Sequence, residues 1–376
     1  MKNLYKNVSR QLLESHDKPP VGHALKRMNN LSGFITGMIR KGSSHLPDIG
    51  YGLLKNIDAN SKTTAAKRFV ANKWTDVETQ YLPYLKAFLK GFIVYALLAT
   101  GEIILTIDGS QMGKHNAALM VSLVWRKRGI PLCWLVKSGS KGHFKEDHHV
   151  EVLKQALLIL LPLLPTDTPV TILGDGEFDG INLQKLCREY GCKYALRTAC
   201  STVFRKDEER FQGKSLSVAQ DHDCLFIEQV EFTDKRYKYV NFLCWHDYKR
   251  HQDPIFLVSN ICCPRAIMEY YDQRYSIECL FKDMKSTSFN VHKTRLKKPE
   301  EVNNLLIIAA LAFILLTTLA HIYDKVEYRK KVQRVRIGKK VLSFFSFAYK
   351  LVEYFLDHDV GFTFSFQFSK FSKNSS

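Results

Sequence analysis

The sequence predicts a mixed α/β fold, a mixed sheet with helices on its faces. Three apolar runs with short connections between them are typical of an antiparallel meander, and they span residues 102–108, 117–128 and 131–137. Helices and strands then alternate in the order helix 147–161, strand 170–175, helix 179–191 and strand 193–198. Three strands followed by alternating helices and strands favour a mixed sheet flanked by helices.

Two further regions surround this core pattern. Residues 1–95 are predicted to be helical and to form an N-terminal DNA-binding region. Within them the segment 61–74 is a basic helix with Ser61 as its expected N-cap. It is a candidate DNA-contacting helix, although a plain surface helix explains it equally well. A β-rich insertion is predicted at 200–263, because charged turns separate three apolar runs, at 224–232, 237–245 and 255–260.

These regions divide the chain into five parts. The expected catalytic core is split by the insertion, and a basic, then aromatic region ends the chain. In order, the parts are residues 1–95, 96–199, 200–263, 264–324 and 325–376.

The composition is strongly basic. Lys and Arg number 55 against 37 Asp and Glu, a formal net charge of +18. Such an excess favours a polyanionic partner, either nucleic acid or an anionic membrane surface. A basic protein without such a partner is the alternative. Nine cysteines without a CxxC pair fit a reduced cytosolic protein and argue against a disulfide framework or a zinc knuckle.

One apolar run, residues 305–320, resembles a membrane segment. It is shorter than the roughly 18 to 20 residues that span a bilayer, so we expect a buried core helix. The first residues contain no apolar signal core. We therefore expect a cytoplasmic, nucleoid-associated protein without a membrane partner. A membrane protein built on residues 305–320 is the alternative.

A helix is predicted over residues 271–285, because no Pro or Gly interrupts them and Pro264 precedes them. At about 100° per residue, one face gathers polar side chains within roughly 60°, and these are Tyr271, Arg274, Glu278 and Lys285, with Lys282 beside them. The opposite face is apolar and would face a core: Ile277, Leu280 and Met284. A solvated face with an i,i+4 pair between Glu278 and Lys282 is the plain alternative.

Three carboxylates are candidates for a metal site. Asp108 ends the first predicted strand and Asp175 ends the fourth. If those strands are neighbours, both side chains emerge at one end of the sheet, and Glu278 can pack across that end. Carboxylate ligands without His or Cys suit Mg²⁺ or Mn²⁺. Two such ions activate water for in-line attack at phosphorus, while Arg274 and the neighbouring lysines would bind phosphates.

Other polar residues are weaker candidates for binding metal or DNA. His143, His148 and His149 lie at a loop and a helix start, where solvated or capping roles are commoner than a metal cluster. Lys137 and Lys141 face either DNA or solvent. The basic segment 325–340 contacts DNA or a second subunit, and the sequence does not distinguish the two.

The motif Tyr271, two residues, Arg274, three residues, Glu278, six residues, Lys285 resembles that of the DDE transposases of bacterial insertion sequences, in the IS-four family. Their catalytic core has the ribonuclease H-like fold. Asp108 stands in the matching context LTIDGSQ, and Asp175 in LGDGEF, where the family more often has Asp-Arg-Gly-Phe. The family also carries a β-strand insertion between the second Asp and the Glu. The resemblance covers residues 60–320.

The resemblance implies cut-and-paste transposition of an insertion sequence. Asp108, Asp175 and Glu278 would bind two Mg²⁺ or Mn²⁺ ions, and water would nick DNA at the terminal inverted repeats of the element. The freed 3′-OH would attack the opposite strand, in members that form a hairpin, and finally target DNA. The motif's Tyr, Arg and Lys would grip phosphates. A homodimer is expected, because two ends must be cut together.

Hairpin formation requires an extruded base, which calls for an aromatic stacking partner. Trp245 in the insertion is the candidate, with a core aromatic as the alternative. Two other functions share the same site: a non-catalytic DNA-binding relic of a transposase, and a metal-dependent DNA nuclease that never joins strands.

Overall fold

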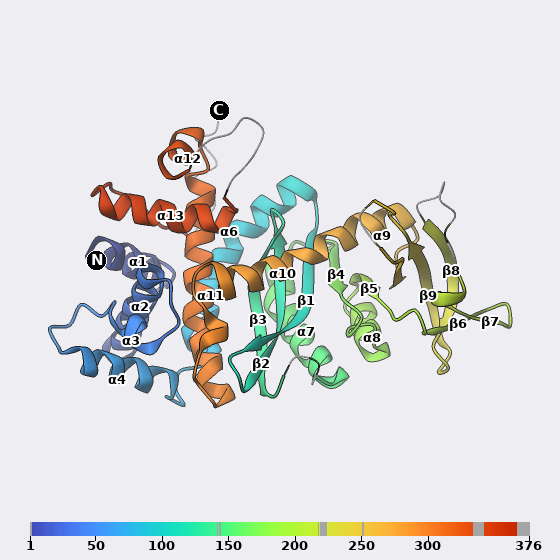
Figure 1. Cartoon of the computed structure of the whole chain (residues 1–376), viewed down its shortest axis with the longest axis horizontal. Coiled ribbons are helices and arrows are strands. Elements are labelled where there is room, and N and C mark those ends of the chain that lie inside the picture. Colours follow the sequence, from blue (N-terminus) through green and yellow to red (C-terminus); the bar gives the residue numbers. More distant parts are fainter. Residues whose placement is uncertain are drawn as a thin grey trace.

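Ten strands form one sheet that runs along the long axis of the molecule (Figure 1). A computed structural model describes residues 2–366 except 141, 143, 217, 219–223, 250–251 and 334–341. The strand order is β3-β2-β1-β4-β5-β10-β9-β8-β6-β7. The bounds are β1 Ile103–Met112, β2 Asn116–Trp125, β3 Arg128–Ser138, β4 Val170–Gly174, β5 Lys193–Arg197, β6 Val203–Lys206, β7 Glu209–Gln212, β8 Cys224–Phe232, β9 Tyr237–Trp245 and β10 Ile255–Ser259.

The first five strands have the ribonuclease H-like arrangement. β1, β2 and β3 form an antiparallel meander, and β4 and β5 add parallel strands on the other side of β1. The remaining strands continue the same sheet, because β10 pairs antiparallel with β5 and β9 with β10. The predicted fold class, a mixed sheet with flanking helices, is confirmed.

Two predicted strand ends in the meander are wrong. β1 does not end at Asp108, because Asp108 and Gly109 pair with Met120 and Leu119 of β2 and the strand runs on to Met112. The turn between β2 and β3 is not at Gly129, which lies inside β3. Instead Arg126 and Lys127 make the turn in the left-handed region, with φ of 47° and 64°, as a tight hairpin requires.

The strands of the β-rich region agree closely with the prediction. β8 and β9 have the predicted bounds, because each is an apolar run between turns. The short hairpin of β6 and β7 was not predicted. Its sequence is rich in charged residues, and it turns at Asp207 and Glu208, both with positive φ.

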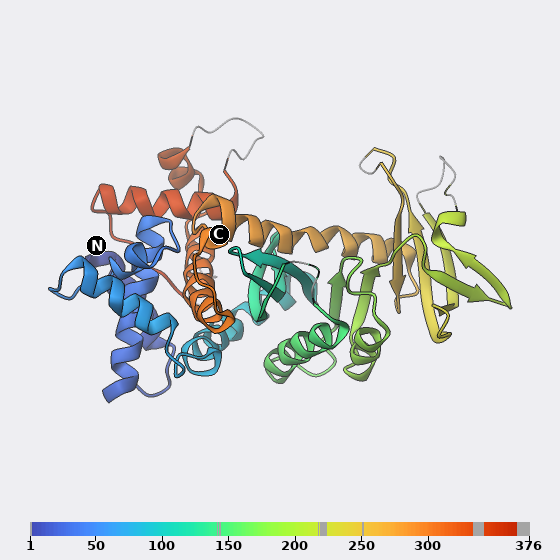
Figure 2. The ribbon, with the colours of Figure 1, turned by 60° about the horizontal axis from the view of Figure 1, so that its bottom comes forward.

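Helices cover both faces of the sheet (Figure 2). On one face lies a nearly continuous helical run, made of α9 Pro264–Tyr271, a 3-10 turn Asp272–Arg274, α10 Tyr275–Lys282 and a π-helical turn Asp283–Thr287. On the other lie α7 Glu146–Leu160 and α8 Ile181–Glu189. The uniform helix predicted for 271–285 is therefore divided into segments. Its predicted apolar face is confirmed, because Ile277, Leu280 and Met284 are fully buried.

The helices predicted for the first 95 residues are present. α1 to α4 lie at the end of the molecule opposite the β-rich strands, and α6 lies beside β1 (Figure 1). They are α1 Lys2–Glu14, α2 Gly22–Lys41, α3 Leu46–Gly50, α4 Ala59–Val70, α5 Val77–Gln80 and α6 Leu82–Thr100. Ser61 is not the N-cap of α4. Asp58 takes that role, because its carboxylate accepts a hydrogen bond from the Ser61 backbone N–H at 2.9 Å.

Helix α11 Pro299–Ile322 packs between the N-terminal helices, β3 and the C-terminal helices α12 Val326–Val332 and α13 Phe344–Asp357. By length and composition α6 and α11 are apolar enough to cross a membrane. In α11 89% of the apolar window is buried inside the protein, whereas in α6 the share is 33%. The buried core helix predicted for 305–320 is confirmed.

Helix α11 ends in a cluster of aromatic rings. His321 lies against Tyr95 and Trp125, with ring centroids 5.2 and 5.4 Å away. Burial lowers the pKa of His321 to about 4, and the positive charge of Arg126 adds to this shift, while Asp324 opposes it. The folded protein therefore holds this imidazole neutral at pH values where an unfolded chain would protonate it.

We expect His321 to make stability depend on acid. The pKa of His321 is lower in the folded protein than in the unfolded chain. The contribution of His321 to the free energy of unfolding is therefore complete above about pH 6.5 and is lost as pH falls through 4. Between pH 7.5 and 4.5 the wild type should lose roughly 2 kcal/mol more unfolding free energy than His321→Gln, after allowance for partial exposure. Urea unfolding at both pH values measures this difference. Equal losses in the two proteins would show that His321 is not held neutral.

Candidate active site

Two aspartates lie side by side where β1 and β4 run parallel. The register places Ile107 beside Gly174, so the next residues of the two chains, Asp108 and Asp175, also correspond. Parallel neighbours are about 4.8 Å apart. Asp108 is only 3% exposed, and the backbone N–H of Glu177 donates a hydrogen bond to Asp175 Oδ1 at 3.1 Å.

A basic residue continues this row. β5 is parallel to β4, with Leu196 beside Gly174, so Arg197 follows at the level of Asp175. Arg197 and Lys214 line a cavity of about 570 Å³ that also includes Asp175. The sequence analysis missed both residues because no motif contains them. Arg197 could have been found from its place in the sequence, because it lies near the end of the predicted strand that follows the strand of Asp175.

The third carboxylate comes from the helical run. Glu278 lies on α10, which packs against β1, β2 and β3. Its carboxylate forms an ion pair with the guanidinium of Arg274, one helical turn earlier. Arg274 is the more buried partner, with 16% of its side chain exposed against 40% for Glu278. Burial works to lower the pKa of Arg274, but Tyr271, Glu278 and Asp108 together raise it.

Tyr271 lies among these charges. Its side chain is 7% exposed, and burial raises the pKa of its hydroxyl. The guanidiniums of Arg274 and Arg197 lower this pKa, and the carboxylates of Asp175 and Glu278 raise it. The guanidinium carbon of Arg274 lies 5.8 Å from the centroid of the Tyr271 ring. Tyr271 and Arg274 are therefore near enough to the acids of both sheet and helix to sense their charge.

The donor set suits a hard divalent cation, because its oxygens are carboxylate oxygens. Within the described part of the chain, no three His, Cys, Asp or Glu side chains are grouped closely enough to hold a metal ion. Glu278 does not join the two aspartates, because its carboxylate is held in the ion pair with Arg274. Two adjacent carboxylates repel each other unless a cation lies between them, so Asp108 and Asp175 fit such an ion, and Glu278 can join them once it leaves Arg274.

The motif residue Lys285 and its neighbour Lys282 lie at the far end of the run. Lys282 is exposed at the end of α10, and Lys285 lies in the π-helical turn. The Lys285 ammonium is 5.9 Å from the centroid of the Phe281 ring.

Trp245 does not lie at the surface as a stacking partner would. It is 4% exposed and belongs to an apolar cluster with Leu173, Leu257 and Tyr271. The indole supports the sheet beneath the helical run, and at this exposure it offers no open ring face to a base.

The histidines near 145 do not form a metal cluster among the residues that the structure describes. The backbone N–H of Lys145 donates to His148 Nδ1 at 3.2 Å, which caps α7. His149 packs on Phe178, with ring centroids 4.6 Å apart, and burial lowers its pKa. The capping role is confirmed for His148, while His143 and Lys141 lie outside the described residues.

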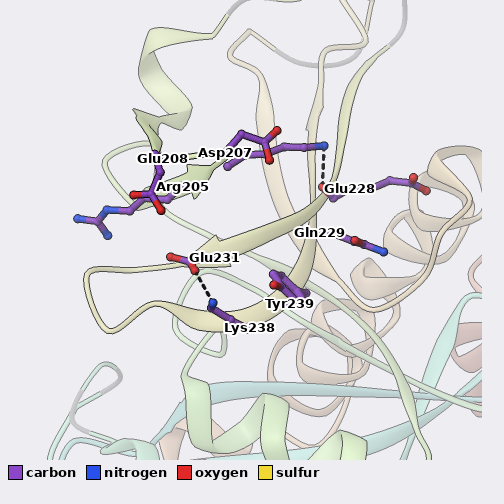
Figure 3. Close-up of a pocket in the computed structure, with 9 residues that line it drawn as sticks. Arg205, Asp207, Glu208, Glu228, Gln229, Glu231, Lys238 and Tyr239 are labelled. Carbon is purple, nitrogen blue, oxygen red and sulfur yellow. Dashed lines mark hydrogen bonds and ion pairs between the residues drawn. The ribbon is translucent and has the colours of Figure 1, made fainter.

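A second polar cavity, of about 460 Å³, lies in the β-rich region far from the three acids (Figure 3). Its charges are engaged with one another. Lys238 Nζ lies 3.0 Å from Glu231 Oε1, and Lys206 Nζ donates to the Glu228 carbonyl oxygen at 3.1 Å. These contacts make the cavity a weaker candidate than the row of strand-end acids.

Comparison with known proteins finds a matching family model and distantly similar solved structures. A family model described as Transposase DDE domain matches residues 113–315. Among solved structures, Ciona intestinalis Endonuclease V in complex with DNA is 14% identical and covers 48% of this chain and 83% of its own, with a TM-score of 0.31. Human ENDOV is 13% identical and covers 61% and 94%, with a TM-score of 0.24. No curated protein matches the chain.

We expect the free protein to bind Mn²⁺ through its two aspartates. Asp108→Asn should weaken binding at least about 10-fold, since loss of even an outer partner of a metal site costs 10- to 100-fold. Arg274→Gln should tighten it, because Glu278 then loses its competing partner. Electron paramagnetic resonance of unbound Mn²⁺ measures both affinities. Unaltered binding by Asp108→Asn would rule out this site.

Proposed function

We propose that this chain, which belongs to the transposase DDE domain family, is a DNA transposase that cuts out an insertion sequence and joins it to target DNA. Enzymes of this family act on DNA and use divalent metal ions. The observation that carries the proposal is the register that pairs Ile107 with Gly174, the residues just before Asp108 and Asp175, beneath a helical run that carries Glu278. Such carboxylates suit two-metal phosphoryl transfer.

The three acids have one role in this proposal. Asp108, Asp175 and Glu278 would hold two Mg²⁺ or Mn²⁺ ions. When bound, the ions would activate the attacking oxygen and neutralise charge on the leaving oxygen. The protein itself would orient the DNA strand, and the neighbouring Arg197 would bind a phosphate near Asp175.

The Arg274–Glu278 ion pair couples DNA binding to completion of the site. A guanidinium binds a phosphate as well as it binds a carboxylate. A DNA phosphate can therefore replace Glu278 as the partner of Arg274, which frees Glu278 to turn toward the aspartates. Tyr271 would position Arg274, and Lys285 would contact the same strand.

The partners in the proposal are DNA and a second copy of the chain. The net charge of +18 favours a polyanion. The terminal inverted repeats of the element and its target DNA would be bound by a homodimer, in a nucleoid-associated cytoplasmic complex. A metal-dependent nuclease without strand transfer shares every residue of this site, and a non-catalytic DNA-binding relic shares the fold. The products made from DNA separate these three functions.

The acids are expected to be essential for cleavage but not for binding. Asp108→Ala, Asp175→Ala and Glu278→Ala should each abolish nicking of a labelled duplex that carries the element's own ends, while the duplex still binds. Glu177→Ala is the matched control, because Glu177 is an exposed acid two residues from Asp175, and it should cleave normally. Normal cleavage by any of the three acid variants would refute the site. Hairpin or joined products would distinguish a transposase from a simple nuclease.

Arg274→Ala and Lys285→Ala should weaken binding of the transposon end. Each lost phosphate contact should reduce the slope of log K against log salt concentration by about 0.9. Fluorescence anisotropy between 50 and 200 mM salt measures the slope. A wild-type slope in both variants would remove these residues from the DNA interface.

A further inference from the structure

A large groove lined by basic residues, called the basic groove below, lies on the other flank of the helical run. It has a volume of about 970 Å³ and is formed by three parts of the chain. These are the β2–β3 turn with Arg126, Lys127 and Arg128, the side of α10 around Tyr275, and the C-terminal helical region around Arg329.

Cations outnumber acids in this groove. The three basic residues of the turn and Arg329 face two lining acids, Asp272 and Asp324. Asp324 lies between two guanidiniums, 3.6 Å from Arg126 Nη1 and 2.6 Å from Arg329 Nε. One carboxylate thus serves two cations. Arg128 Nε lies 3.6 Å from Asp283 Oδ2, and the four cations still outnumber the three acids, so the local charge remains positive.

Two lining residues hold buried polar atoms without a hydrogen-bond partner. Ser276 is 2% exposed, and its hydroxyl has none. Nη1 of Arg329 also has none. A buried polar group without a partner is costly, and an oxygen-rich anion would supply acceptors to both. Tyr275, 57% exposed beside them, adds an aromatic ring on which a sugar or base can pack.

The groove adjoins the candidate active site along the chain itself. Cys279 lines the groove and directly follows Glu278, and Tyr275 directly follows Arg274. The same helical run therefore presents Glu278 on one flank and the groove on the next. A DNA strand bound at the acids would continue onto a positively charged surface.

We propose that the basic groove binds the phosphate backbone of the DNA that extends beyond the cleaved position. This inference rests on the proposed function and assigns it a second DNA contact, supplied by the β2–β3 turn and the C-terminal region. Guanidinium and ammonium groups that project from separate elements bind a backbone without reading its sequence. The groove therefore contributes affinity and orientation, and sequence preference comes from elsewhere.

The test measures the salt dependence of duplex binding without divalent metal. Lys127→Gln removes an exposed cation at the tip of the turn and leaves a polar, uncharged side chain. Lys185→Gln is the matched control, since Lys185 is exposed on α8 at the opposite face of the sheet. Lys127→Gln should lower the slope of log K against log salt concentration by about 0.9 and weaken binding several-fold at 100 mM salt. Lys185→Gln should match the wild type.

A second readout locates the contact directly. Bound duplex should protect Cys279 from alkylation, measured by mass spectrometry, in the wild type and in Asp108→Ala. Equal slopes for Lys127→Gln and Lys185→Gln, with Cys279 alkylated equally in free and bound protein, would overturn the inference and leave the proposed function intact. Failure of the wild type to bind duplex DNA would overturn both.

Discussion

The parallel pairing of β1 with β4 is the constraint on which the rest of the candidate site depends. It brings together two segments that are more than sixty residues apart, and its register sets Asp108 beside Asp175. Side chains alternate between faces along a strand, so a slip of one residue would turn one of them to the opposite face. The same logic extends to β5, whose register puts Arg197 next in the row. The core of buried apolar strands thus fixes charge positions that no local interaction would hold.

The helical run from α9 to the π-helical turn carries the third carboxylate, Glu278, and its partner Arg274. It is fixed by its apolar face, with Ile277 and Leu280 fully buried, and the packed face determines where the polar face points. A carboxylate and a guanidinium four residues apart satisfy each other while DNA is absent. In the proposed function, a DNA phosphate that replaces Glu278 as the partner of Arg274 would free Glu278 to join the two aspartates.

Much of this organisation could be predicted from the sequence, for physical reasons that differ between elements. β8 and β9 are apolar runs between turns, so their ends were found to the residue, whereas the charged β6–β7 hairpin depends on pairing and was missed. Asp-Gly at 108 favours a turn locally, yet pairing with β2 carries the strand through it. The three acids were proposed from predicted strand ends and helix spacing, although Asp108 lies inside β1. The Arg274–Glu278 pair, the place of Arg197 and the burial of Trp245 follow from tertiary register, which one sequence does not contain.

We propose that Asp108, Asp175 and Glu278 converge on divalent metal when DNA is bound. The most direct measurement is anomalous diffraction from crystals of the protein bound to an end duplex and soaked with Mn²⁺. The account predicts anomalous peaks within coordination distance of all three carboxylates, with Arg274 turned from Glu278 to a phosphate. Peaks elsewhere, or a Glu278 still paired with Arg274 in a complex that holds metal, would contradict it.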